Sequence, residues 1–237
     1  MKVTGEQVVL GESSPRTTEE HTARYAFAST YVAGKRVLDI ACGSGYGVNM
    51  LREAGASLIE GVDISEEAIL FAKQNFGAPN VTFTCASAAD TLFPEHSFDV
   101  VTSFETIEHL EDETRRVYLQ NLHKWLVPNG ILILSTPNKK VTSPFTKKPL
   151  NPFHILEYRL SNLRAELEER FTIASVFGQR LVPKIATLYI VRRFIRVVEV
   201  LLRRQFTLYD TPTGPEVVAY DKRTREPRFF VLLCRPR

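Results

Sequence analysis

Short apolar runs alternate with segments of helical periodicity along most of the chain. Runs of about five to seven residues, bounded by glycine, proline or charged residues, predict buried strands. Between them, apolar residues recur at steps of three and four, as in amphipathic helices. The expected strands cover 36–41, 57–62, 81–85, 98–103, 129–135, 171–177 and 228–234, and the expected helices cover 16–33, 48–54, 66–76, 104–110, 115–126 and 161–170. This alternation predicts an α/β domain.

Local signals place several of the boundaries. We expect Ser65 to cap the helix 66–76, whose first turn carries Glu66 and Glu67, because a serine hydroxyl accepts from an unpaired backbone N–H and acids favour a helix N-terminus. By the same argument Thr17 or Thr18 caps the first helix and Ser161 caps the helix 161–170. Pro128-Asn-Gly130 predicts a turn before the fifth strand.

A glycine-rich turn follows the first strand. Gly43, Gly45 and Gly47 let the backbone turn tightly and approach a ligand, where a Cβ would clash. Asp63 ends the next strand, about 20 residues later, where an acid can accept from both ribose hydroxyls of a nucleotide. Strand, glycine turn and helix together predict a nucleotide-binding unit.

Composition changes this picture little. The chain has 237 residues, 44% hydrophobic and 24% charged, with a net charge of +3, which fits one soluble domain and is too small a charge to argue for nucleic acid. The three cysteines are far apart and suggest neither a disulfide set nor a metal site. The N-terminus has no apolar signal segment and no apolar run reaches 18 residues, so we expect a cytoplasmic protein.

Four motifs carry a family resemblance. Asp39-Ile-Ala-Cys-Gly-Ser-Gly-Tyr-Gly47, Gly61-Val-Asp63, Phe98-Asp-Val-Val101 and Leu126-Val-Pro-Asn-Gly130 stand in this order. They resemble the class I S-adenosylmethionine (SAM)-dependent methyltransferases over roughly residues 16–178 plus a final strand. Ala41 departs from the family, in which many members have glycine at that position.

The resemblance implies a fold, an activity and a cofactor site. The fold is a Rossmann-like, doubly wound, seven-stranded sheet with helices on both faces and its last strand antiparallel, in one domain over 1–237. The activity is methyl transfer from SAM. The residues expected to hold SAM are Asp39, Gly43, Gly45, Gly47, Asp63, Ile64, Ser87 and Ala88, with Ile64 packing on the adenine and Ser87 and the Ala88 amide at its edge. Ser87 stands where family members usually place an acid.

The first helix is expected to cap the site. His21, Arg24 and Tyr25 share one helical face at i, i+3 and i+4. The resemblance implies that such a helix closes over the methionyl end of SAM, so that Arg24 or Tyr25 touches SAM or the acceptor. An amphipathic helix that simply covers the sheet is the alternative.

A polar cluster follows the fourth strand. In a helix, the spacing of Glu105, Glu108 and His109 would put all three on one face, where two carboxylates and an imidazole can bind a divalent cation such as Mg²⁺ or Mn²⁺. His154 could be a fourth ligand. The pattern resembles that of small-RNA 2′-O-methyltransferases, and some ubiquinone-pathway O-methyltransferases also carry Glu-x-x-Glu-His. Without a metal, His154 or His109 is the expected general base. The alternative is that these side chains only form a polar face that lines the cleft.

The acceptor is expected to be a hydroxyl group. A sugar hydroxyl is too weak an acid to ionise unaided at neutral pH, so a cation or a base would have to assist. The stretches 20–25, 103–110, 135–138 and 151–154 look like bacterial methyltransferases of glycan and glycolipid pathways, which implies O-methylation of a sugar, glycan or glycolipid. The alternatives are an RNA 2′-O-methyltransferase, a small-molecule (quinone or natural-product) O-methyltransferase and a SAM-binding protein without catalysis.

A basic segment, residues 180–206, interrupts the link between the last two strands. We expect one amphipathic helix over about 185–205, with five basic side chains, Lys184 just before it and Glu199 as its only acid. Such a helix can pack on the domain, close over a substrate, form a homodimer contact or lie on an anionic membrane. The sequence leaves these options and the oligomeric state open.

Overall fold

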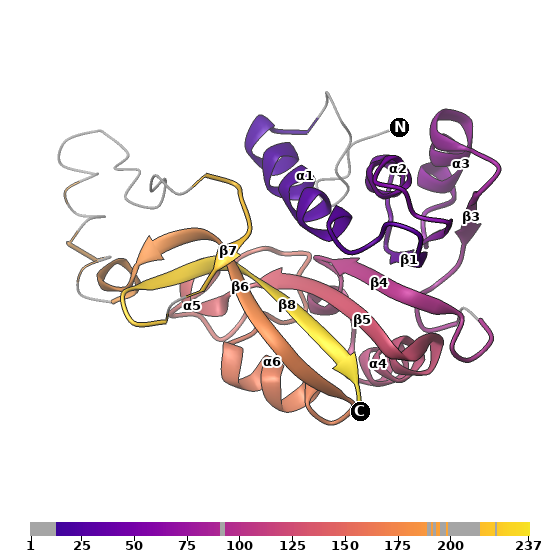
Figure 1. Ribbon diagram of the computed structural model, residues 1–237. Helices are drawn as coiled ribbons and strands as arrows, with labels where there is room; N and C mark the ends of the chain where they lie inside the picture. Colours follow the sequence, from indigo (N-terminus) through magenta and orange to yellow (C-terminus); the bar gives the residue numbers. More distant parts are fainter. Residues whose placement is uncertain are drawn as a thin grey trace.

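The computed structural model describes residues 13–90, 93–188, 191, 193–194, 198, 214–220 and 222–237. These residues form one mixed sheet of eight strands in the order β3-β2-β1-β4-β5-β8-β6-β7 (Figure 1). The strands are β1 Arg36–Ile40, β2 Leu58–Asp63, β3 Val81–Cys85, β4 Phe98–Phe104, β5 Leu126–Pro137, β6 Phe171–Pro183, β7 Val218–Ala219 and β8 Arg225–Pro236. The first five run parallel, and β8 runs antiparallel to both of its neighbours. The doubly wound fold with an antiparallel last strand is confirmed; β7, a two-residue edge strand, is an addition to the expected seven.

Helices cover both faces of the sheet. On one face lie α1 (Pro15–Ser29), α2 (Tyr46–Glu53) and α3 (Glu66–Phe76), and on the other lie α4 (Asp112–Trp125) and α6 (Leu160–Leu167) (Figure 1). Each layer has its own buried core, built around Val48 and Leu51 on the first face and around Tyr118 and Trp125 on the second. Two apolar faces explain why the central strands read as nearly continuous hydrophobic runs. Among the described residues, no helix combines the length and apolarity needed to cross a membrane.

The chain reverses its strand order at β1. This strand pairs with β2 on one side and β4 on the other, so the connections leave β1 and β4 in opposite directions. A crevice opens at such a switch point, beyond the carboxyl ends of the strands. The fold therefore places the residues after β1, β2 and β4 around one opening.

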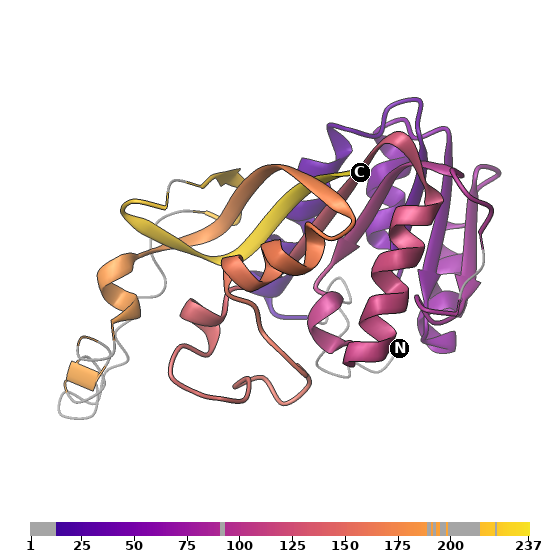
Figure 2. The same cartoon turned by 90° about the horizontal axis from the view of Figure 1, so that it is seen from below.

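The last two long strands extend beyond the rest of the sheet. β6 was expected to end at residue 177 and β8 to start at 228, but their pairing continues from Phe171 opposite Pro236 to Pro183 opposite Arg225. β5 pairs with β8 only over 229–234, so the remainder projects as a two-stranded ribbon (Figure 2). Beyond Pro183 the chain forms a 3₁₀ turn, η2 (Lys184–Thr187). The predicted helix 185–205 is wrong at its start and otherwise lies largely outside the described residues.

Several local predictions are confirmed and others are corrected. Ser65 caps α3 through a hydrogen bond from the Ala68 amide, as expected. The cap of α1 is Ser14, not a threonine, with Pro15 in the first helical position, where its missing N–H costs nothing. α6 starts at Leu160 without a side-chain cap, so Ser161 lies inside it.

The expected turn at 128–130 is also different. It is a bulge within β5, because Phe98 pairs with Leu126 and Val100 pairs with Ile131. Four residues of β5 thus face one residue of β4.

Candidate active site

One cleft of about 780 Å³ opens at the switch point of the sheet. Its walls come from the residues after β1, β2 and β4, from α1, and from the segment 142–157 that follows α5 (Lys139–Thr142). The expected cofactor residues Gly43, Asp63, Ile64, Ser87 and Ala88 line one part of it. The expected chemical residues Glu105, His109 and His154 line the same cleft. The structure thus brings both predicted sets together.

The glycine turn needs glycine for two different reasons. Gly43 has φ +54° and a Cβ there would meet nothing within 4 Å, so it faces the open cleft. Gly45 and Gly47 are absent from the lining: a Cβ on Gly45 would lie 2.6 Å from Ala72, and one on Gly47 would lie 2.0 Å from the Tyr25 ring. Ala41 has φ +60°, a left-handed conformation that glycine adopts most easily, so the glycine that the family resemblance implies at this position would fit the turn without strain.

Asp63 is held as a ribose acceptor would need to be. Its carboxylate accepts from the Gly43 amide at 2.8 Å and from the Ser65 amide at 2.9 Å, so the glycine turn and the start of α3 fix its orientation. Each carboxylate oxygen has a further lone pair for a ligand hydroxyl. Next to it, Ile64 is 75% exposed. An apolar side chain left that open at the cleft wall is suited to pack against a flat ligand such as adenine.

Asp39 lies beneath the glycine turn and not in the cleft lining. It is fully buried and accepts from Tyr25 at 3.0 Å and from Thr102 at 2.6 Å. Burial raises the pKa of Asp39 to about 7, although these two hydrogen bonds act in the opposite direction. The Tyr25 contact joins α1 to β1, so the geometry gives Asp39 a supporting position behind the cofactor residues.

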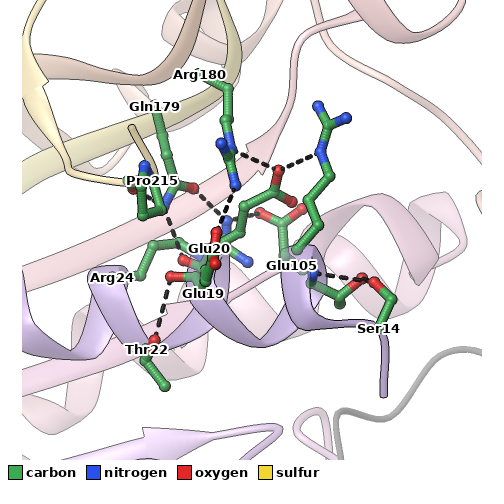
Figure 3. Close-up of polar contacts among 11 residues, drawn as sticks. Ser14, Glu19, Glu20, Thr22, Arg24, Glu105, Gln179, Arg180 and Pro215 are labelled. Atoms are coloured by element: carbon green, nitrogen blue, oxygen red, sulfur yellow. Dashed lines mark hydrogen bonds and ion pairs between the residues drawn. The ribbon is translucent and has the colours of Figure 1, made fainter. Parts of the chain in front are cut away.

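α1 closes one side of the cleft through a polar network with β6 (Figure 3). Arg24 is 1% exposed and donates to Gln179 at 2.6 Å, while the Gln179 amide donates back to the Glu20 carbonyl at 2.7 Å. Arg180, in a strained backbone conformation of φ +53°, pairs with Glu20 at 3.0 Å.

Several side chains of α1 line the cleft. Arg24 and Tyr25 line the cleft and are also buried against the sheet; the helix thus covers the sheet, and the contact of these two side chains with SAM or the acceptor stays a prediction. His21 lines the cleft as well, and burial, with Arg24 nearby, keeps its pKa well below the ordinary value.

The helix expected at 104–110 is wrong. Glu105 has φ +52°, and only a 3₁₀ turn, η1 (Ile107–His109), follows. The Glu108 carbonyl accepts from the amides of Ile155 and Leu156, so the segment is tied to the 151–157 loop instead of continuing as a helix. The three polar side chains therefore do not share one helical face.

Glu105 points to one side of the cleft. Its carboxylate accepts from the Ser135 hydroxyl at 2.6 Å and lies 3.9 Å from the Arg24 guanidinium. Strained backbone conformations of this kind, when surrounding contacts hold them, are concentrated at functional sites. The structure thus separates Glu105 from the other members of the predicted metal cluster.

Glu108 points inward and is fully buried. One carboxylate oxygen accepts from Thr136 at 2.9 Å, and the other, Oε1, has no hydrogen-bond partner among the described residues. Burial raises the pKa of Glu108 well above its ordinary value, and the negative charge of Glu105 raises it further. A buried carboxylate with an unsatisfied oxygen is costly unless it is protonated or binds a cation.

The two histidines of the cleft lining, His109 and His154, lie beside each other. Their rings lie 4.9 Å apart, and Nδ1 of His109 lies 3.1 Å from the Phe153 carbonyl oxygen. Nδ1 of His154 lies 3.0 Å from Glu157, and its Nε2 lies 2.8 Å from the Asn151 amide nitrogen. The other end of the Asn151 amide accepts from the Phe153 N–H at 3.1 Å, so the amide orientation is set and His154 carries its proton on Nδ1.

Glu108, His109 and His154 form a group that fits a metal ion. One ligand atom from each lies within 4.8 Å of the others. Imidazole and carboxylate ligands suit Mn²⁺, Fe²⁺ and Zn²⁺. Metal-binding histidines usually donate their second ring nitrogen to a carbonyl or a carboxylate, as Phe153 and Glu157 are placed to accept here. The unsatisfied Oε1 of Glu108 is a second, independent sign of a missing partner.

Sequence reasoning missed Glu157, Asn151 and Gln179. Glu157 is 6% exposed and accepts from Thr142 at 2.6 Å as well as from His154. Burial alone would raise its pKa, but the hydrogen bonds from His154, Thr142 and Ser143 outweigh burial and lower it. The i, i+3 spacing of His154 and Glu157 was the available signal. Gln179 offered none, because its partners on α1 lie about 155 residues earlier in the chain and a third, the Pro215 carbonyl, lies 36 residues later.

Comparison with known proteins places this geometry in a family. Residues 37–130 match the methyltransferase domain family. A probable S-adenosylmethionine-dependent methyltransferase of Mycolicibacterium smegmatis is 31% identical over 169 residues, which are 71% of this chain and 64% of that protein. A ubiquinone biosynthesis O-methyltransferase of Neisseria meningitidis is 34% identical over 116 residues, 47% of this chain and 48% of that protein. The chain thus covers less than two thirds of these curated relatives.

A solved structure supports the same assignment at the level of the fold. The N-methyltransferase NodS from Bradyrhizobium japonicum WM9, in complex with S-adenosyl-L-homocysteine, has a TM-score of 0.60 at 15% identity, over 95% of this chain and 89% of that one. The relatives and this structure include both O- and N-methyltransferases by name, so they do not decide the acceptor. Together with the glycine turn, Asp63 and the sheet order, these matches identify a class I S-adenosylmethionine-dependent methyltransferase domain in this chain.

Proposed function

We propose that this protein transfers a methyl group from SAM to a hydroxyl of a sugar, glycan or glycolipid acceptor, with a divalent cation held by Glu108, His109 and His154. The observation that carries the proposal is that His109 and His154 line the same cleft as the cofactor residues, with a ligand atom of the buried Glu108 within 4.8 Å of theirs. Donor and acceptor would then share one enclosed space. Methyl transfer is an in-line displacement in which the protein mainly supplies position and a competent nucleophile.

The acceptor hydroxyl must lose a proton during transfer. A divalent cation bound at this group would lower the pKa of the hydroxyl and fix its position. His154 is oriented for the same task, because Glu157 accepts from its Nδ1 and stabilises the charge that the ring gains when Nε2 takes a proton. In either case an acceptor or ligand at Nε2 of His154 replaces the Asn151 amide that contacts it here.

The remaining cleft wall suits a polyhydroxylated acceptor. Glu20, Glu105 and Asn151 offer hydrogen-bonding groups, while Phe153 and Phe229 supply apolar surfaces. Ligand sites commonly combine a few polar groups of this kind with apolar walls. Arg24 lies 5.1 Å from the centre of the Phe229 ring and holds that ring in place.

Calorimetry tests the cofactor and the metal without knowledge of the acceptor. We expect S-adenosylhomocysteine to bind, and Mn²⁺ or Mg²⁺ to bind to the resulting complex. Glu108→Gln and His154→Asn should abolish metal binding while retaining cofactor binding, and Glu111→Gln, an exposed acid two residues beyond His109, is the matched control. Cofactor binding without any metal binding would leave a base-catalysed methyltransferase and remove the cation from the proposal.

A transfer assay tests the acceptor class. Labelled methyl from SAM should appear in a glycan or glycolipid fraction and survive mild alkali, as a methyl ether does and a methyl ester does not. Glu108→Gln should lose this label. Label only in protein or amine products would contradict the proposed acceptor.

An aromatic hydroxyl is the second candidate. It is favoured by the 34% identity to the ubiquinone biosynthesis O-methyltransferase and by the apolar side chains Leu150, Phe153 and Phe229 in the cleft. A phenol ionises near pH 10, far more easily than a sugar hydroxyl. Activity on catechol-type acceptors that persists in Glu108→Gln would favour this candidate.

A further inference from the structure

A second pocket lies at the outer end of the β6–β8 ribbon, where Pro183 pairs with Arg225. Its volume is about 380 Å³. We call it the basic pocket, and the residues that define it are Lys140, Phe145, Arg159, Lys184, Leu188 and Glu226. Three of these six side chains are cationic and one is acidic.

The single acid of the basic pocket is already engaged. Glu226 pairs with Lys140 at 3.0 Å and accepts from Tyr220 at 3.1 Å. Within the described part of the chain, neither Arg159 nor Lys184 has an ion-pair partner. Among the described residues, these two cations of one small concavity have no acidic partner, an arrangement that favours an anionic ligand.

The surrounding sequence adds to this charge. Residues 139–148 contain four lysines and no acid, whereas the whole chain has a net charge of only +3. The segment that supplies Lys140 and Phe145 to the basic pocket is thus positively charged. The positive potential of such a segment attracts anions from solution and falls off over about 10 Å at moderate ionic strength.

Apolar side chains stand open at the same place. Phe145 is 49% exposed, Leu188 is 56% exposed and Ile185, in η2, is 60% exposed. A site that combines arginine and lysine with exposed apolar side chains suits a phosphoryl group attached to an apolar or lipid moiety.

The basic pocket and the methyl-transfer cleft are lined by neighbouring residues of the same chain segments. On three segments, a residue of one site lies two positions from a residue of the other: Lys140 and Thr142, Arg159 and Glu157, Glu226 and Arg228. Two residues span about 6.6 Å in extended chain, and less in the helix α5, which holds Lys140 and Thr142. One elongated ligand can therefore reach both sites.

We propose that the basic pocket binds a phosphoryl group, carried by the methyl acceptor, beside the hydroxyl that is methylated. The link to the acceptor rests on the proposed function; the phosphoryl site itself does not. Phosphoryl groups of this kind occur on lipid headgroups and on soluble sugar phosphates, and the experiment separates these two sources.

Two probes are used on the full chain. Inorganic pyrophosphate is titrated by calorimetry, and vesicles of phosphatidylglycerol with phosphatidylcholine are compared with pure phosphatidylcholine by co-sedimentation. The test variant is Arg159→Gln/Lys184→Gln, and the matched control with the same loss of charge is Lys73→Gln/Arg116→Gln, on the distant helices α3 and α4. S-adenosylhomocysteine binding is measured on every sample, so a failure of the cofactor site is recognised separately.

We expect at least one probe to bind, with weaker binding at higher salt, and the test variant to weaken it at least about tenfold while the control does not. Binding to anionic vesicles would identify a lipid-borne phosphoryl group, and binding of pyrophosphate alone would identify a soluble one. Binding of neither probe, or equal binding by the test variant and wild type, would overturn the proposal.

Discussion

Nδ1 of His154 lies 3.0 Å from the carboxylate of Glu157, and that carboxylate is also held by Thr142. This contact fixes the tautomer of the histidine and directs its Nε2 toward the cleft. The imidazole is thus prepared both to bind a cation and to accept a proton. It is the contact from which the chemistry of the site can be tested most directly.

Glu157→Gln should weaken metal binding roughly 10- to 100-fold, because the amide orients His154 but no longer adds negative charge behind it. S-adenosylhomocysteine affinity should stay unchanged. Calorimetric titrations with Mn²⁺ and with S-adenosylhomocysteine measure the two affinities. Glu168→Gln is the control, because the Glu168 side chain is 42% exposed directly after α6. An unchanged metal affinity would separate Glu157 from the site.

Metal binding should strengthen as the pH rises. Burial and the charge of Glu105 raise the pKa of Glu108, and a cation binds only the deprotonated carboxylate. Affinity is therefore lost as the pH falls through that raised pKa. Glu105→Gln removes the neighbouring charge, so the whole pH profile should move to lower pH. If Glu105 were itself a ligand, affinity would instead fall at every pH.

Ile64→Ala should weaken S-adenosylhomocysteine binding about tenfold, the effect of losing a few buried methyl groups. The side chain is 75% exposed in the described structure, so the stability of the free protein should change little. Leu70→Ala, at 52% exposure on α3 and outside the cleft lining, is the matched control. Equal affinities in both variants would remove Ile64 from the adenine site.

Asp39→Asn should change the pH dependence of stability in a defined direction. Folding raises the pKa of Asp39 from 3.8 to about 7, so the folded state binds more protons between these values and the free energy of unfolding falls as the pH rises through this range. The variant has no carboxyl group at this position, so its free energy of unfolding lacks this decrease. Its melting temperature, relative to wild type, should therefore increase from pH 4 toward neutrality, which thermal unfolding at several pH values measures; a constant difference would contradict the buried, protonated acid.

The sequence predicted the parts of the fold that depend on local signals. Ser65 and the acids after it placed α3 correctly, because a cap and a helix start are decided within one turn. The helix expected at 104–110 failed for a non-local reason: the Glu108 carbonyl bonds to a loop more than 40 residues later. The grouping of His109 with His154 was expected, but the separate direction of Glu105 was not, because Ser135 and Arg24 set it from other strands and helices.

The network that joins α1 to β6 also bears on how the chain folds. Arg24 and Gln179 are separated by 155 residues, and Glu20 and Arg180 by 160. Contacts of such long sequence separation form late, since closing a long loop costs entropy before the contact repays it. During synthesis, α1 leaves the ribosome before β6 and finds its partners only after β6 has been made. The wall of the cleft that α1 supplies is thus among the last parts of the described structure to be completed, and it is fixed only once the chain has been made through Arg180.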